Sequence, residues 1–297
     1  MKFHRINGKV RKVDDNDDAA TTASGAALIE VLNANPPNAQ DPLRRGLPFQ
    51  PRSYRDFMLF EAHYYGVAMG MTQLYRPAAY YLARLYGLLT GGGGEFPLFK
   101  PSALWYSQPI WYQSNHLAFV ADGAPVHCPA YAEYLDVELE LGVVLGRELY
   151  NATPQEAEQA IAGFCVFNDF SVRNGQMAEM ASGFGPQHSK CFANSISSIV
   201  VSADEIFPVL HKLAGRVVVN GDVVSECRAD KWQFTMGEAL AHASKATRLF
   251  PGEFFGSGTF PGGAGIEHAR FRLQVGDTVR LEIDGIGSVT NTIVAET

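Results

Sequence analysis

Residues 134–146, YLDVELELGVVLG, alternate apolar and acidic side chains and then become wholly apolar. Successive side chains of an extended chain point to opposite faces, so Asp136, Glu138 and Glu140 would share one face, opposite three aliphatic side chains. The apolar run at 143–145 is typical of a buried strand. The stretch therefore predicts a core strand that carries three carboxylates on one side.

Two interpretations account for this acidic face. The Cα atoms of Glu138 and Glu140 would lie about 6.6 Å apart with their side chains parallel. Two anions held so close in a poorly hydrated place would force a proton onto one of them unless a cation neutralises both. Oxygen ligands favour a hard ion, Mg²⁺ first, with Ca²⁺ and Mn²⁺ as alternatives. On this stretch alone, a solvated acidic face explains the pattern equally well.

A second motif favours the metal interpretation. Residues 163–176, GFCVFNDFSVRNGQ, form an apolar run that ends in Asn168 and Asp169, and Arg173 and Gln176 follow. A carboxylate at the end of a buried strand, with a guanidinium and an amide close behind, is typical of a metal ligand and its substrate-facing donors. Asn-Asp is also an ordinary turn pair, so the motif does not decide the question by itself.

Composition limits the classes of protein. The chain has 297 residues, 46% of them hydrophobic, and a formal net charge of −7. No Lys/Arg run is longer than a pair such as Arg44–Arg45, so we expect no nucleic-acid partner. The four cysteines are single, which indicates a reduced, cytoplasmic protein. No apolar stretch has the roughly 18 residues of a membrane span, and we expect neither membrane insertion nor secretion.

The chain divides into an N-terminal extension at 1–48 and a catalytic domain at 49–297. The extension combines a short basic strand with a helix that ends before Pro36. In the domain, apolar residues recur at helical spacing over 57–71 and 77–89.

The C-terminal two thirds of the chain alternates short strands with Gly, Asn and Asp turns. Helices interrupt it at 153–164, where Thr153 and Glu156 have the spacing of a capping box, and at 235–244. The predicted fold class is α+β, mostly β.

Six segments carry a family resemblance. In order they are DVELELGVVLGRE (136–148), GFCVFNDFSVRNGQ (163–176), SKCFANSISSIVV (189–201), VVVNGDVV (217–224), GSGTF (256–260) and VGDTVRLEIDGIGSVTNTI (275–293). Over roughly residues 48–297 the sequence resembles the fumarylacetoacetate hydrolase family. The resemblance implies a mixed β-roll core, a homodimer, a small-molecule substrate and a divalent metal in the active site.

The resemblance also implies the metal ligands. Glu138 and Glu140 match the two glutamates of the family's metal strand, and Asp169 matches its aspartate at the next strand end. Asp56 matches a further aspartate ligand. Asp136 lies outside this set, and we expect it to be solvated or to support the ligands.

The base identifies a branch of the family. Smaller members carry a His and a Glu on a lid, but Phe57 and Phe60 occupy those positions here. In the fumarylacetoacetase-like branch, an aspartate ligand is followed seven residues later by a histidine base, as in Asp56 and His63. A glutamate that orients this base matches Glu267.

The resemblance assigns the remaining polar residues to the substrate. Lys190, with Arg173 and Gln176, would stabilise an oxyanion. Met58 and Thr72 stand where the branch has a tyrosine and an arginine that binds a substrate carboxylate. Losing both groups favours a less acidic or more apolar substrate.

Residues 73–104 look like a helical insertion. Its tyrosines would either cover a larger substrate or simply pack an extra helix. Either of its two arginines would bind a substrate carboxylate in place of the family's arginine, which is absent at position 72. These residues are Tyr75, Tyr80, Tyr81, Tyr86, Arg76 and Arg84.

The resemblance implies a Mg²⁺-dependent hydrolase that cleaves a carbon–carbon bond of a β-diketone or acylpyruvate-like molecule. A decarboxylase, a tautomerase or another lyase or isomerase on the same scaffold is the alternative. A third interpretation is a non-enzymatic relative that keeps the metal site for structure.

Overall fold

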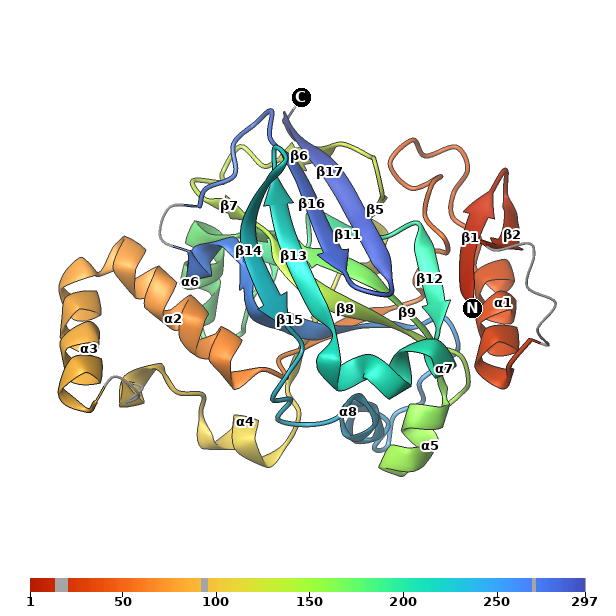
Figure 1. Cartoon of the computed structure of the whole chain (residues 1–297), viewed down its shortest axis with the longest axis horizontal. Helices are drawn as coiled ribbons and strands as arrows, with labels where there is room; N and C mark the ends of the chain where they lie inside the picture. The colour runs from red at the N-terminus through yellow and green to blue at the C-terminus, as the bar shows by residue number, and fades with distance from the viewer. Residues whose placement is uncertain (14–20, 92–95, 269–270, 297) are drawn as a thin grey trace.

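Two β-sheets packed face to face form the centre of the computed structural model, with helices around them (Figure 1). The structure describes residues 1–13, 21–91, 96–268 and 271–296. Within these ranges, no helix has the length and apolar character needed to cross a bilayer.

The larger sheet has ten strands, and its central strands carry the site. In spatial order, eight of them are β2 (Lys9–Lys12), β1 (Lys2–Ile6), β12 (Ile199–Ser202), β9 (Ile161–Asp169), β8 (Glu138–Leu145), β15 (Phe254–Ala264), β3 (Tyr54–Phe57) and β4 (Trp111–Ser114). β11 (Asn194–Ile196) pairs with β9 and with β5 (Phe119–Ala121).

The second sheet has five strands and covers the first. Its order is β14 (Asp222–Arg228), β13 (Ala214–Val219), β16 (Thr278–Ile283), β17 (Gly287–Ala295) and β6 (Val126–Cys128). A separate pair joins β7 (Leu135–Asp136) to β10 (Ser171–Val172). Gly215 of β13 meets Leu139 of β8 so closely that an added Cβ would lie 2.7 Å from Leu139 Cδ2.

The helices lie outside the sheets. They are α1 (Ala23–Ala34), α2 (Glu61–Tyr75), α3 (Pro77–Leu89), α4 (Ala103–Ser107), α5 (Pro154–Gln159), α6 (Arg173–Ala181), α7 (Ala203–Ile206) and α8 (Met236–Ala243). Short 3₁₀ turns are η1 (Pro97–Phe99), η2 (His116–Ala118), η3 (His188–Lys190), η4 (Phe207–Lys212) and η5 (Gly265–Glu267). The predicted capping box of Thr153 and Glu156 is confirmed at the start of α5.

Strand β8 is the predicted core strand, and all eight of its residues are buried. Leu139 points toward the second sheet, so the alternation directs Glu138 and Glu140 to the opposite side, where they line a cavity. Their exposed fractions are 3% and 1%. The interpretation of a solvated acidic face is therefore wrong.

The first 48 residues pack onto the larger sheet. β1 pairs antiparallel with β12, and α1 ends before Pro36 with Leu28, Val31 and Leu32 buried in the core. The described part of this segment contributes two strands, with β2 at the edge of the larger sheet, and a covering helix.

The predicted insertion, 73–104, comprises the last turn of α2, then α3 and η1, and the start of α4; residues 92–95 lie outside the described residues. In Figure 1, α3 lies at the far edge of the molecule, away from both sheets. Tyr81 is 68% exposed and Leu89 is 79% exposed.

Candidate metal centre and active site

Three carboxylates meet at the centre of the larger sheet. Asp56 on β3, Glu140 on β8 and Asp169 at the end of β9 each offer an oxygen, and these oxygens lie within 4.8 Å of one another. All three side chains are buried. Sheet pairing brings them together, because β15 joins β3 to β8, and β8 pairs with β9.

A glycine makes this convergence sterically feasible. Gly256 on β15 pairs with Asp56 on the neighbouring strand β3 and with Gly142 on the other neighbour, β8. A Cβ at position 256 would lie 2.2 Å from Asp56 Oδ1 and 2.6 Å from Glu140 Oε2. Any side chain larger than hydrogen would therefore push these two carboxylates aside.

The electrostatics of the cluster call for a cation. Burial raises the pKa of Asp56, and burial together with the neighbouring carboxylates raises that of Glu140 well above its usual value. Burial also raises the pKa of Asp169. Asp56 Oδ1 is buried without a hydrogen-bond partner. Carboxylate oxygens that carry excess negative charge, one of them without a hydrogen-bond partner, are suitable ligands for a hard divalent ion.

Glu138, the fourth predicted ligand, lies beside this cluster and contacts two cations. Lys190 Nζ donates to Glu138 and also to Asp169, and Arg173 Nη1 lies 2.8 Å from Glu138 Oε1. Burial alone would raise the pKa of Glu138, but the charges of Lys190 and Arg173 lower it. The structure thus brings three predicted ligands to one centre and places Glu138 at its cationic edge.

Asp136 and Arg173 form a fully buried ion pair. Arg173 Nε donates to Asp136 Oδ2 at 2.7 Å, and both side chains are 0% exposed. Of the two expectations for Asp136, solvation is wrong, because the carboxylate is buried, neutralises a guanidinium and accepts from Ile266 N at 2.9 Å. Support of a ligand fits, since its partner Arg173 also contacts Glu138. Arg173 Nη1 also donates to Gln176 Oε1 at 2.8 Å. With Nε and Nη1 engaged by protein oxygens, Arg173 positions Glu138 and Gln176.

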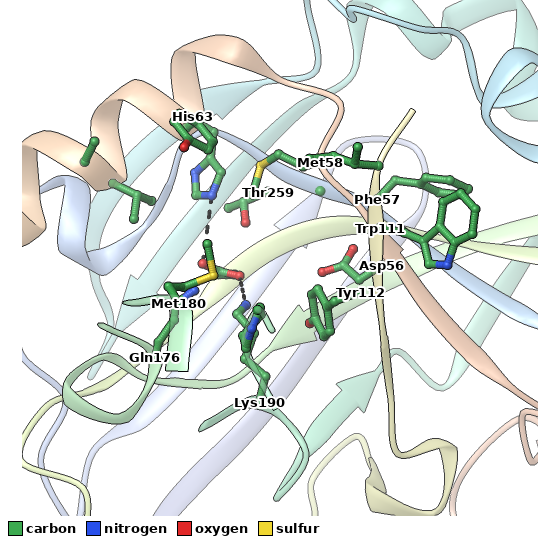
Figure 2. A pocket seen from close by; sticks show the side chains of 18 of the residues that line it. Asp56, Phe57, Met58, His63, Trp111, Tyr112, Gln176, Met180, Lys190 and Thr259 are labelled. Carbon is green, nitrogen blue, oxygen red and sulfur yellow. Dashed lines mark hydrogen bonds and ion pairs between the residues drawn. The ribbon is translucent and has the colours of Figure 1, made fainter. Parts of the chain in front are cut away.

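His63 on α2 faces the carboxylate centre. Its Nδ1 lies 3.3 Å from Glu267 Oε2, and its Nε2 lies 3.9 Å from Glu138 Oε1. Figure 2 shows the His63 ring and the Lys190 side chain approaching the centre from opposite sides. Glu267 is fixed in turn, because its Oε2 accepts from Ala264 N at 3.0 Å. The structure therefore brings the predicted base and its predicted partner into contact.

Two glycines on α2 allow this contact. An added Cβ at Gly66 would lie 2.4 Å from Glu267 Oε1, and one at Gly70 would lie 2.0 Å from Ile266 O. Both glycines share the helix face of His63, at one and two turns' distance. The spacing of glycines in EAHYYGVAMGM was the sequence signal for this close packing.

Sequence reasoning missed Tyr112 and Thr259. Tyr112 on β4 pairs with Asp56 and donates its hydroxyl proton to Asp169 Oδ2. Thr259 Oγ1 donates to Glu140 Oε1 at 3.2 Å. Thr259 belongs to the quoted GSGTF segment, so its position was a usable signal, whereas Tyr112 becomes recognisable only through the pairing of β3 with β4.

A cavity of about 710 Å³ opens onto the cluster. It is lined by Asp56, His63, Glu138, Glu140, Gln176 and Lys190, together with many apolar side chains. The insertion contributes Leu98 and Phe99 of η1 to this lining. Its four tyrosines, Arg76 and Arg84 are absent from the described lining, so the structure places the expected lid and anion clamp outside the cavity.

The packed sheets and the buried carboxylates define a β-roll protein with a site of the metal-binding type. The family model for the fumarylacetoacetate hydrolase C-terminal domain matches residues 98–294. The chain belongs to the fumarylacetoacetate hydrolase family, whose members include metal-binding enzymes.

Similar proteins differ in their named activities. A mitochondrial oxaloacetate tautomerase of Xenopus laevis is 31% identical over 189 residues, which cover 63% of this chain and 58% of the relative. A fumarylacetoacetate hydrolase structure from Exiguobacterium antarcticum aligns over 100% of both chains with a TM-score of 0.68 and 19% identity.

A third similar protein is a fumarylpyruvate hydrolase from Pseudomonas aeruginosa, solved with Mn²⁺ and pyruvate. It covers 83% of this chain and 91% of its own, with a TM-score of 0.59 and 20% identity. These likenesses confirm the predicted fold class.

Proposed function

We propose that this chain is a divalent-metal-dependent hydrolase that cleaves a carbon–carbon bond of a β-diketone or acylpyruvate-like molecule. The observation that carries the proposal is the His63–Glu267 pair, which faces the three-carboxylate cluster across one cavity. A base beside a metal-type site is the arrangement needed to activate water next to a polarised carbonyl.

Asp56, Glu140 and Asp169 would hold the metal, with Glu138 beside them as a fourth ligand. When bound, the metal polarises a substrate carbonyl and stabilises the enolate of a 1,3-dicarbonyl compound. Mg²⁺ is the proposed ion because every donor is a carboxylate oxygen, and Mn²⁺ and Ca²⁺ are the alternatives. The Mn²⁺ of the fumarylpyruvate hydrolase supports a divalent ion in this fold.

His63 takes a proton from water at Nε2, because its Nδ1 faces Glu267. Glu267 holds one tautomer and stabilises the imidazolium that forms. The hydroxide oxygen bonds to the substrate carbonyl carbon, and the adjacent carbon–carbon bond breaks. Its electron pair leaves on the departing carbon as an enolate, which is then protonated.

Lys190 and Gln176 would stabilise the developing oxyanion, and their position in the cavity lining supports this role. One such donor typically contributes about 3 to 4 kcal/mol. Arg173 contributes indirectly, because it is buried between Asp136 and Glu138. It keeps Glu138 oriented toward the centre.

A tautomerase or decarboxylase is the second candidate. The name of the Xenopus relative, an oxaloacetate tautomerase, supports it. Enolisation needs the same carboxylates and base but no attacking water, so the residues in this site serve both reactions.

The test is a screen of β-diketones and acylpyruvates with Mg²⁺ in ¹⁸O-labelled water, with products identified by mass spectrometry. Hydrolysis places one ¹⁸O in a new carboxylate product. Release of CO₂, or an unchanged substrate mass, would contradict hydrolysis and favour the second candidate. His63→Ala and Glu138→Ala serve as blanks, and full activity in His63→Ala would contradict the assigned base.

We also propose that the protein is a cytoplasmic homodimer. The composition and the family resemblance support this assignment. Light scattering coupled to size-exclusion chromatography measures the assembly, and a monomer at working concentration would contradict it.

A further inference from the structure

The cavity combines a charged centre with a largely apolar wall. His63, Val67 and Met71 share one face of α2 at intervals of four residues, and all three line the cavity. Two helical turns separate His63 from Met71, a rise of about 12 Å. The cavity therefore continues from the carboxylate centre along α2 over a distance greater than the length of a pyruvate molecule.

The rest of the cavity wall is largely apolar. Leu98 and Phe99 of η1 line it, as do Met180 of α6 and Phe184 in the following loop. Figure 2 shows Met180 close to Gln176, between His63 and Lys190 in that view. Phe184 is 83% exposed and Leu98 is 82% exposed. Large apolar side chains thus remain uncovered where the cavity opens, and an apolar ligand would remove their surface from water.

Few of the described lining residues are charged. Among the described residues, those that line the cavity and carry an acidic, basic or imidazole group are Asp56, His63, Glu138, Glu140 and Lys190. Lys190 is already bound to Glu138 and Asp169. No arginine belongs to the described lining. A carboxylate at the far end of a substrate would therefore find no cationic partner in the described lining, whereas an alkyl or aryl group there would bury apolar surface.

We infer that the substrate is a 1,3-dicarbonyl acid whose far end is an uncharged alkyl or aryl group. The reactive half of this molecule rests on the proposed function, whereas the apolar half rests on the lining of the cavity. The chemical class is an acylpyruvate with a long or aromatic acyl group. A dicarboxylic compound is excluded from this class.

Pentanoylpyruvate and glutarylpyruvate test this inference, because they differ only in a terminal methyl or carboxylate. Calorimetry on Mn²⁺-loaded His63→Ala measures binding without turnover, and kcat/KM on the wild-type protein measures hydrolysis. Pentanoylpyruvate should bind at least about tenfold more tightly than glutarylpyruvate. From acetyl- to pentanoylpyruvate, affinity should rise about fourfold per methylene.

A positive charge introduced into the apolar wall should shift the ratio of the affinities for pentanoylpyruvate and glutarylpyruvate. In Met180→Arg, the ratio of affinities should move toward glutarylpyruvate by about tenfold, because the new guanidinium pairs with the carboxylate. Leu82→Arg is the matched control, since Leu82 is 58% exposed on α3 and outside the described lining. An equal shift in both variants, or none in Met180→Arg, would contradict the assigned wall.

The outcomes separate this inference from the proposed function. Hydrolysis that favours glutarylpyruvate overturns the inference and keeps the hydrolase. Tighter binding of pentanoylpyruvate without hydrolysis keeps the apolar end and overturns the hydrolase. Failure to bind any acylpyruvate overturns both.

Discussion

Glu138 and Glu140 lie two residues apart on β8, yet their surroundings differ. Lys190 and Arg173 lower the pKa of Glu138 despite its burial. Burial and the carboxylates of Asp56 and Asp169 raise the pKa of Glu140. Glu138 is already neutralised by protein cations, whereas Glu140 has no ion pair with a described Lys, Arg or His, so an added ion would stabilise its charge.

Adding a single methyl group at position 256 by substitution with alanine tests the metal centre. Gly256→Ala should weaken Mn²⁺ binding by at least about tenfold, because the new Cβ would displace Asp56 and Glu140. Overpacking should also lower the free energy of unfolding by about 1 to 3 kcal/mol. Calorimetric titration and urea denaturation measure these two effects.

Gly46→Ala provides the control for this substitution. Its Cβ would meet Ala121 at 3.1 Å, far from any carboxylate of the cluster. Equal loss of Mn²⁺ affinity in the two variants would contradict the steric explanation.

Glu267 is tested by removing its charge while keeping its shape. In Glu267→Gln, kcat should fall by about a hundredfold, because the amide no longer stabilises the imidazolium of His63. The Mn²⁺ dissociation constant should stay unchanged, since Glu267 is not a proposed ligand. An unaltered kcat would show that Glu267 does not orient the base.

At the scale of elements, the contact between α2 and η5 positions the base. Gly66 and Gly70 bring the helix close to Glu267 and Ile266. Met58 O also accepts from Trp105 Nε1 of α4 at 2.6 Å, which fixes the segment between β3 and α2. The base is therefore placed by helix packing, whereas the carboxylates are placed by strand pairing.

Gly70→Ala should disturb the helix packing that places His63 and leave the strand pairing that places the carboxylates intact. Its Cβ would lie 2.0 Å from the backbone oxygen of Ile266, so α2 must shift away from η5. We expect kcat to fall at least about tenfold, because a displacement of 1 Å at a reacting group can cost far more. Mn²⁺ affinity should change little.

Gly25→Ala on α1 is the helical control. Its nearest contact would be Thr22 Oγ1 at 3.1 Å, on an element distant from the site. A parallel loss of Mn²⁺ affinity in Gly70→Ala would indicate that the substitution disturbs the sheet as well.

For the whole molecule, the buried cluster links stability to metal binding. Three carboxylates with raised pKa values oppose folding until a cation binds. A ligand at a hundred times its Kd stabilises the native state by about 2.7 kcal/mol. Mg²⁺ or Mn²⁺ should therefore raise the Tm, and EDTA should reverse the change.

Glu140→Gln should remove most of this metal-dependent increase in Tm. Without metal, the variant should be at least as stable as the wild type, because the buried charge that it removes is opposed by the neighbouring carboxylates of Asp56 and Asp169. Differential scanning calorimetry with and without Mn²⁺ measures both effects. The same metal-dependent increase in both proteins would place the ion elsewhere.

Local patterns predicted much of this molecule. Alternation along 134–146 determined which side chains of β8 share a face, because a strand has a period of two. Unlike the assignment of Asp56 and His63, which depended on the family resemblance, the capping box at Thr153 is equally local. Such features depend on backbone geometry over a few residues, so the sequence is sufficient to predict them.

The tertiary structure alone decided which charges meet. Arg173 pairs with Asp136, Lys190 bridges Glu138 and Asp169, and Tyr112 reaches Asp169. These partners are 21 to 57 residues apart in the chain. Their contact depends on strand pairing and helix packing across the whole domain, because ångström-scale distances between remote segments are set only when the sheets close.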